Sequence, residues 1–252
     1  MDPSWVGKQV GTVPGFSQNK YGVLGEKAVV PAHVLAEVPP SLSAVEAAAV
    51  WMQYGTAYGA LVPFGKVVAG DFVLITAASS SVGLAAIQIV KAQGGRSIAT
   101  TRTSAKKQEL LELGADFVIA TQEEDLVARV QEITAGKLAR VVFDPVGGDY
   151  MNTLGAATAN GGSIFLYGML SQTPTPFPMT TFARGVAMYG YSIFEMLQPQ
   201  YYETMKRYIY DRLADGTFQP KVDRVFKLDD IVEAYRYLES NQQVGKIVVT
   251  VG

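Results

Sequence analysis

A run of small residues between an apolar strand candidate and an apolar helix candidate is the part of this sequence best suited to chemistry. The run is AASSSVG, residues 77–83, and it directly follows FVLIT. Small residues let a backbone approach a pyrophosphate, and the free N–H groups at the start of a helix bind anions. In a G-x-G-x-x-G frame only the last of the three glycine places is glycine. The pattern predicts a dinucleotide phosphate loop, and the alternative is an ordinary serine-rich connection. The predicted contacts are Ala78, Ser79, Ser80, Ser81, Val82 and Gly83.

Two cations stand where the adenosine ribose of such a cofactor would lie. In dinucleotide-binding folds, an enzyme that uses NAD places Asp or Glu at the end of the second strand. Counted from Gly83, that position is Thr101, which carries no charge, and Arg102 and Lys106 follow it. Arginine and lysine suit a 2′-phosphate, so the sequence predicts NADPH rather than NADH. The alternative is that both are solvated cations at the start of a helix.

Asp144 is a carboxylate at the end of another apolar run, in DPVGG (residues 144–148). Ligands of open α/β sheets bind at the carboxyl ends of the strands, so Asp144 could line the cofactor groove. It could equally end the strand in a turn that uses the two glycines. Both interpretations stay open.

A parallel sheet would bring these residues to one edge, and the sequence alternates as such a sheet requires. The strand candidates are continuous apolar runs, as expected when both faces of a parallel sheet are covered. They are Phe72–Thr76, Ser97–Thr101, Phe117–Ala120, Val141–Asp144, Ser163–Tyr167 and Ala187–Tyr191. The helix candidates between them are Val82–Ala92, Ser104–Leu113, Glu123–Thr134 and Tyr150–Ala159. The sequence therefore predicts an α/β fold with a doubly wound, six-stranded parallel sheet of the Rossmann type.

The two ends of the chain differ from the middle in composition and in the elements that they predict. Residues 1–40 are rich in Gly, Pro and Val and suggest short strands between turns. Ser43, with Glu46 three residues later, forms a capping-box pattern before an apolar helix. A helix over Gln200–Ala214 and an α/β tail follow the predicted sheet.

The composition excludes several classes of function. The net charge of the 252 residues is -2, which leaves no electrostatic footprint for nucleic acid or an anionic membrane. There is no cysteine and one histidine, His33, so a disulfide framework, a thiol nucleophile and a cysteine-based zinc site are excluded. No unbroken apolar run could span a membrane and the start shows no secretory signal, so a soluble cytoplasmic protein is expected.

Four motifs in order resemble the medium-chain dehydrogenase/reductase superfamily. They are AASSSVGLAAIQ, FDPVGGD (Phe143–Asp149), NGGSIFLYG (Asn160–Gly168) and the closing VGKIVVTV. The branches they are most similar to are quinone oxidoreductase-like and zinc-type alcohol dehydrogenase-like proteins. MQYGTAYGAL (Met52–Leu61) is similar to the family's helix leading into the cofactor domain, which implies that Thr56 lies beside the nicotinamide and that Tyr54 is a pocket candidate. Further implied cofactor contacts are Val146, Gly168, Met169 and Leu170.

The resemblance also implies a domain plan. The family begins with a GroES-like β-domain that is split in sequence around the cofactor domain. By this plan residues 1–50 are a remnant of that catalytic domain, 51–195 form the NADP-binding Rossmann domain, and 196–252 are a helix and α/β tail that return to the catalytic domain. The chain would then carry a partial GroES-like domain from both ends, without the segment that forms most of the first-lobe substrate pocket.

No metal site is predicted. Zinc members of the family hold the metal with cysteine, with histidine or glutamate, and with a second cysteine. Counted back from Thr56, the place of the last ligand is Met52, whose neutral thioether is a poor zinc ligand. Tyr202 and Lys206 form a Y-x-x-x-K, the catalytic pair of short-chain dehydrogenases, but they are interpreted as neighbours on an ordinary helix.

The expected function is therefore an NADPH-dependent, metal-free oxidoreductase that reduces a quinone, enone or other small carbonyl substrate. The alternatives are a zinc-type NADP-dependent alcohol dehydrogenase and an NADPH-binding protein without turnover. A homodimer is expected through the apolar strand at residues 186–194, since such a strand is a poor exposed edge.

Overall fold

The apolar runs in the middle of the chain form one six-stranded sheet in the computed structural model, which describes residues 3–252. The strands are β3 (Phe72–Ile75), β4 (Arg96–Thr101), β5 (Phe117–Ala120), β6 (Ala139–Asp144), β7 (Thr158–Leu166) and β8 (Ala187–Gly190). Their order across the sheet is β5-β4-β3-β6-β7-β8, and every neighbouring pair is parallel. This is the doubly wound order, so the predicted α/β sheet of the Rossmann type is confirmed.

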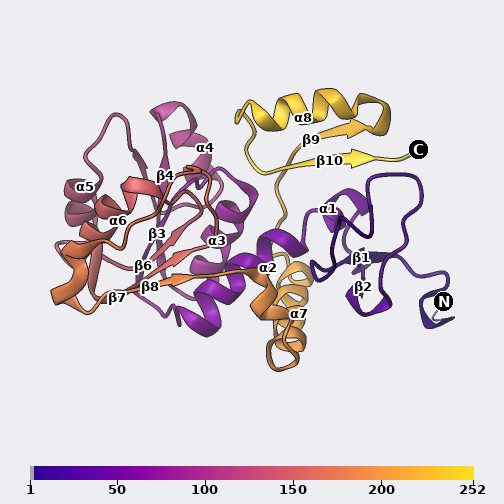
Figure 1. Cartoon of the computed structure of the whole chain (residues 1–252), viewed down its shortest axis with the longest axis horizontal. Coiled ribbons are helices and arrows are strands. Elements are labelled where there is room, and N and C mark those ends of the chain that lie inside the picture. Colours follow the sequence, from indigo (N-terminus) through magenta and orange to yellow (C-terminus); the bar gives the residue numbers. More distant parts are fainter. Residues whose placement is uncertain (1–2) are drawn as a thin grey trace. The chain divides into compact units, whose positions relative to one another are not determined.

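Helices cover both faces of this sheet. They are α3 (Ser81–Ala92), α4 (Lys107–Glu112), α5 (Leu126–Ile133) and α6 (Met151–Ala156). Right-handed crossovers place α3 and α4 on one face and α5 and α6 on the other (Figure 1). Leu84, Ile87 and Val90 of α3 are buried, and Val130 and Leu154 join the core on the opposite face. Two covered faces explain why the strands are apolar without alternation.

The helix predicted to run to Ala159 ends earlier, because distant and local groups bind its last carbonyls. The Thr158 hydroxyl donates to the Leu154 carbonyl (2.7 Å), and the Arg184 guanidinium donates to the carbonyl of Gly155 (2.6 Å). Thr158 itself begins β7. Capping by Arg184, 29 residues away in the sequence, is a tertiary contact that the local pattern could not indicate.

The helix predicted from Glu123 begins later, at Leu126. Glu123 and Glu124 both donate their N–H groups to the Ala120 carbonyl and form a turn. Asp125 is the N-cap, since its carboxylate accepts a hydrogen bond from the N–H of Ala128 at 2.9 Å.

The chain divides into two compact units, which we call the sheet unit and the terminal unit. The sheet unit is Thr56–Ser192, and the terminal unit joins the chain up to Gly55 with Ile193–Gly252. The helix α2 (Trp51–Gly59) crosses the first boundary and continues as a π-helical turn at Ala60–Phe64. The assignment of these segments to a catalytic domain and a cofactor-binding domain stays a prediction.

The terminal unit contains two small sheets. β1 (Val10–Thr12) and β2 (Leu35–Glu37) pair antiparallel, and β9 (Val222–Lys227) and β10 (Lys246–Thr250) pair parallel. Its helices are α1 (Ala44–Ala48), α7 (Pro199–Ala214) and α8 (Ile231–Glu239). The predicted capping box before α1 is confirmed by reciprocal bonds between Ser43 and Glu46, at 2.8 and 3.2 Å. Short 3-10 turns lie at Pro3–Trp5, Ala32–Val34, Ser104–Lys106, Gly148–Tyr150, Met179–Arg184, Ile193–Leu197 and Leu228–Asp230.

Within residues 3–252, every helix is too short or too polar to cross a membrane.

Candidate functional site

The phosphate-loop candidate turns directly from β3 into α3. Ala77 adopts a left-handed conformation (φ 46°), and the N–H of Ala78 donates to the Thr100 carbonyl of the neighbouring strand (3.2 Å). Ser80 is the N-cap of α3, and its hydroxyl accepts from the N–H of Gly83 at 3.1 Å. The first turn of a helix has no internal partners for its N–H groups. The start of this 12-residue helix is therefore suited to an anion.

Packing explains the one glycine that the loop retains. A Cβ atom at Gly83 would lie 2.6 Å from the Cα and 2.7 Å from the carbonyl oxygen of Ala78. Both are backbone atoms, so a side chain would force α3 away from the loop. Ala78 is fully buried, whereas Ser79, Ser80 and Val82 remain partly accessible. Ser81 is buried at the start of the helix.

The cation candidates follow the end of β4. Thr101 is half-buried, Arg102 is exposed and Lys106 is half-buried. The backbone hydrogen bonds between β4 and β5 continue beyond the ends of the two strands. The N–H groups of Thr121 and Gln122 donate to the carbonyls of Thr101 and Arg102, both at 2.9 Å. The backbone that carries the Arg102 side chain is therefore held in place by the next connection.

Asp144 anchors a turn. Its side chain is fully buried, one oxygen accepts from the Thr76 hydroxyl, and the other accepts from the Gly147 N–H at 2.7 Å. Burial raises the pKa of Asp144, and the hydrogen bonds from Thr76 and Gly147 oppose that rise. These contacts join the ends of β3 and β6 and leave no carboxylate surface to line a groove. The structure thus favours the turn over direct cofactor contact.

The loop that follows β7 forms backbone hydrogen bonds with the loop that follows β6. The N–H groups of Leu170 and Ser171 donate to the carbonyls of Pro145 and Val146, both at 2.9 Å. A Cβ atom at Gly168 would lie 2.8 Å from the Pro145 carbonyl oxygen, so this approach needs glycine. Met169 and Leu170 are 72% and 66% exposed, and together they offer an apolar surface that a planar ring could cover.

Tyr167 was not among the predicted site residues, because in the sequence it is only the last residue of a strand candidate. Its ring stacks on Phe143 with 4.0 Å between centroids, and its hydroxyl is buried. Burial raises the pKa of this phenol, the Asp144 carboxylate raises it further, and Ser80 lowers it. Tyr167 therefore packs just after the end of β7, with its buried hydroxyl near the Ser80 side chain of the phosphate-loop candidate.

The two residues of α2 are placed differently. Thr56 is buried in the sheet unit, which also holds all the other cofactor candidates. Tyr54 is fully buried in the terminal unit, where its ring stacks on Phe218 with 4.8 Å between centroids. A ring enclosed in this way packs the core, so its placement does not support a role in a pocket.

The donors among the described residues do not group as a zinc site would. In the part of the chain that the structure describes, residues 3–252, no three His, Cys, Asp or Glu side chains gather as a metal site would require. Met52 is exposed and offers only a thioether.

Comparisons with known proteins agree with this architecture. Quinone oxidoreductase 1 of Escherichia coli is 38% identical over 135 residues, which cover 54% of this chain and 39% of that protein. The crystal structure of an NAD-dependent alcohol dehydrogenase superposes with a TM-score of 0.79 at 33% identity, covering 92% of this chain and 66% of that one. Escherichia coli quinone oxidoreductase complexed with NADPH superposes with a TM-score of 0.79 at 28% identity, covering 86% and 68%.

The chain corresponds to only a part of the curated relatives that it matches over most of its length. It spans 11% of a phenolphthiocerol/phthiocerol polyketide synthase subunit of Mycobacterium tuberculosis, at 27% identity. It spans 64% of a quinone oxidoreductase-like protein 2 homolog of Nematostella vectensis, at 28% identity. The model of the zinc-binding dehydrogenase family matches residues 81–209, more than half of the chain. The chain therefore belongs to this family, in the quinone oxidoreductase-like branch of the medium-chain dehydrogenase/reductase superfamily.

Proposed function

We propose that the chain is an NADPH-dependent oxidoreductase that reduces a quinone, an enone or another small carbonyl compound without a metal. The observation that carries this proposal is the turn from β3 into α3, where packing requires Gly83 and a helix start faces the carboxyl edge of the sheet. When bound, the cofactor supplies a hydride from its nicotinamide ring.

The chain's own residues bind the cofactor and orient its nicotinamide ring. The N–H groups at the start of α3 bind the pyrophosphate, and Arg102 and Lys106 bind the 2′-phosphate. The backbone at Gly168–Leu170 contacts the nicotinamide, while Met169 and Leu170 cover it with apolar surface and exclude water. Asp144 acts as a positioning residue, since it holds the turn whose backbone includes Val146.

Two relatives support the choice of cofactor and reaction, and a third supports an alternative. The Escherichia coli proteins are named as quinone oxidoreductases, and one is described as complexed with NADPH. The NAD-dependent alcohol dehydrogenase favours the alternative of alcohol oxidation. A protein that binds NADPH without turnover is the other alternative. We also propose a homodimer and a cytoplasmic setting.

Two measurements on the chain test the proposal. Calorimetric titration should give tighter binding of NADPH than of NADH. Steady-state oxidation of NADPH with a panel of quinones and enals should then give turnover. Binding without turnover would favour the non-catalytic alternative, and stoichiometric zinc by metal analysis would favour the alcohol dehydrogenase. Absence of cofactor binding would overturn the proposal.

A further inference from the structure

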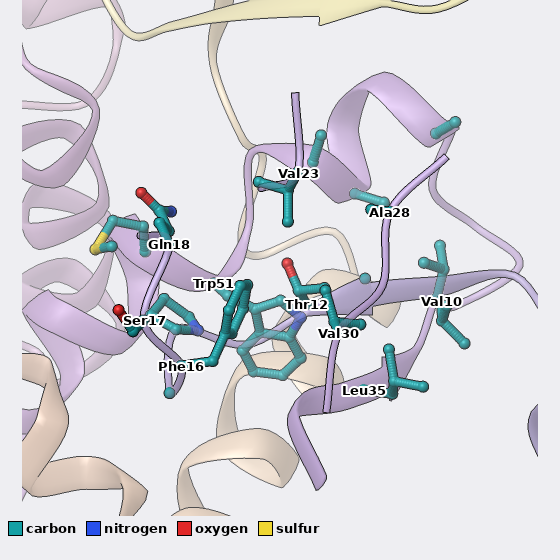
Figure 2. A pocket seen from close by; sticks show the side chains of 18 of the residues that line it. Val10, Thr12, Phe16, Ser17, Gln18, Val23, Ala28, Val30, Leu35 and Trp51 are labelled. Atoms are coloured by element: carbon teal, nitrogen blue, oxygen red, sulfur yellow. The ribbon is translucent and has the colours of Figure 1, made fainter. Parts of the chain in front are cut away.

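The terminal unit holds a cavity of about 970 Å³, and none of its lining residues belongs to the sheet unit. Its walls come from β1, β2, α1 and the connection between the two strands, and Trp51 at the start of α2 lies between them (Figure 2). Ligand pockets in proteins usually measure about 300–1,000 Å³. The cavity is therefore large enough for a drug-sized molecule.

The lining carries no charge. Charged residues make up 17% of the chain, yet none of the residues that line the cavity is Asp, Glu, Lys, Arg or His. Burying an unpaired ion costs far more than burying a neutral group. The cavity offers a charged group no counter-charge, so a neutral molecule suits its lining better than an ion does.

The apolar part of the lining is open to solvent. Val10, Val23 and Met52 are exposed, and Phe194 is 59% exposed. Adjacent exposed apolar side chains of this kind mark binding surfaces, because covering them removes apolar area from water. The aromatic rings of Phe16 and Trp51 also line the cavity (Figure 2). Phe16 is half-buried and can contact a planar ring, whereas Trp51 is 5% exposed and contributes only the edge of its side chain to the wall.

A few polar groups of the lining are free to orient a ligand. Within residues 3–252, the side chains of Thr12, Ser17, Gln18 and Asn19 take part in no hydrogen bond. Thr12 lies on β1 and Ser17 and Gln18 on the facing wall (Figure 2). Hydroxyl and amide groups can bond to a carbonyl, phenol or amine of a neutral molecule.

The Trp51 side of the cavity is fixed before any ligand binds. Trp51 packs edge-on against Tyr210, with 5.1 Å between ring centroids. The Tyr210 hydroxyl in turn donates to the carbonyl oxygen of Glu37, at the end of β2. A ring held in this way loses little freedom on binding, which favours affinity.

From this geometry we infer that the terminal unit binds a neutral, planar aromatic molecule with one or two hydrogen-bonding groups, and that it does so without NADPH. The volume sets the size of the ligand, the uncharged lining sets its charge, and the free polar side chains set its hydrogen-bonding groups. The inference stands independently of the proposed oxidoreductase activity.

Two dyes with one aromatic scaffold test the charge rule. N-phenyl-1-naphthylamine is neutral, and 8-anilino-1-naphthalenesulfonate carries the same rings with one sulfonate. In fluorescence titrations without cofactor, the neutral dye should bind saturably with one site per chain. The sulfonate should bind at least roughly ten-fold more weakly, because the cavity offers it no cation. Equal affinities, or no saturable binding of the neutral dye, would overturn the inference.

Variants locate the site. Thr12 is exposed, so Thr12→Lys should fold and should strengthen binding of the sulfonate by about ten-fold. Ser41→Lys adds the same charge at an exposed position outside the lining and should leave both affinities unchanged. In Trp5→Phe, Trp51 is the remaining tryptophan of the chain, and its emission should fall as the neutral dye binds. Identical effects of the two lysines, or unquenched Trp51 emission, would place the dye elsewhere and refute the assignment.

Discussion

Arg102 is exposed and directly follows the last residue of β4. That last residue is Thr101, which has no carboxylate to accept a hydrogen bond from a ribose. A charge-assisted hydrogen bond is typically worth about 1.5–3 kcal/mol. Arg102→Ala should therefore weaken NADPH by about ten-fold or more and leave NADH nearly unchanged, as measured by calorimetric titration.

Lys91→Ala is the control for this charge change. It removes an exposed cation at the other end of α3 and should leave the affinity for NADPH unaltered. Equal losses for the two cofactors in Arg102→Ala would contradict the assignment, as would tighter binding of NADH by the unmodified chain.

Asp144 makes stability depend on pH. Because burial raises its pKa in the folded chain, folding is favoured most below the ordinary value of 3.8 and loses this contribution as the pH rises through the folded value. Asn at this position can still accept from Gly147 and donate to Thr76, and it does not titrate. In urea unfolding at pH 4, 5.5 and 7, the unmodified chain should lose stability relative to Asp144→Asn as the pH rises. A relative gain would mean that the folded pKa is lowered.

Asp144→Ala separates the hydrogen bonds from the charge. It leaves the buried Thr76 hydroxyl and the Gly147 N–H without their acceptor, which should cost about 2–4 kcal/mol at pH 7. Asp144→Asn should stay within about 1 kcal/mol of the unmodified chain at that pH. Similar losses in the two variants would show that the partners of this carboxyl do not matter.

Among the secondary-structure elements, α3 packs against the backbone of the loop that precedes it so closely that a side chain at Gly83 does not fit. Gly83→Ala would place a methyl group against the backbone of Ala78, which cannot move without shifting the end of β3. We expect the free energy of unfolding to fall by about 1–3 kcal/mol, as measured by urea denaturation. NADPH should also bind more weakly in calorimetric titration.

Gly22→Ala is the control, since a Cβ atom at the exposed Gly22 meets no atom within 4 Å. It should change neither stability nor binding appreciably. If Gly83→Ala bound NADPH as tightly as Gly22→Ala does, the close approach of helix and loop would have no part in cofactor binding.

At the scale of the whole molecule, β8 lies at one edge of the sheet and Tyr189 on it is 49% exposed. A bare edge of apolar residues favours pairing with a second strand. Light scattering should give about twice the chain mass of 27.1 kDa. Tyr189→Lys should give the monomer, because a charge on an edge strand opposes pairing.

Tyr235→Lys makes the same change at an exposed position of α8 and should leave the dimer intact. A monomer mass for the unmodified chain at all concentrations would reject the dimer.

The alternation of strands and helices could be predicted from the amino-acid sequence, because continuous apolar runs such as FVLIT are local features. The strand order was predicted from the doubly wound fold that this alternation matches, and the favoured hand of the crossovers then assigns each helix to a face. The capping box at Ser43 and the turn into α3 could also be predicted from the sequence, because each depends on residues only a few positions apart.

Features that depend on residues distant in the sequence could be found only in the folded chain. The end of α6 depends on Arg184, and the role of Asp144 depends on Thr76, 68 residues before it. The enclosure of Tyr54 depends on Phe218, and the uncharged cavity on residues from two strands and two helices. Burial and hydrogen-bond partners are properties of packed chains, so a pattern of neighbouring residues carries little information about them.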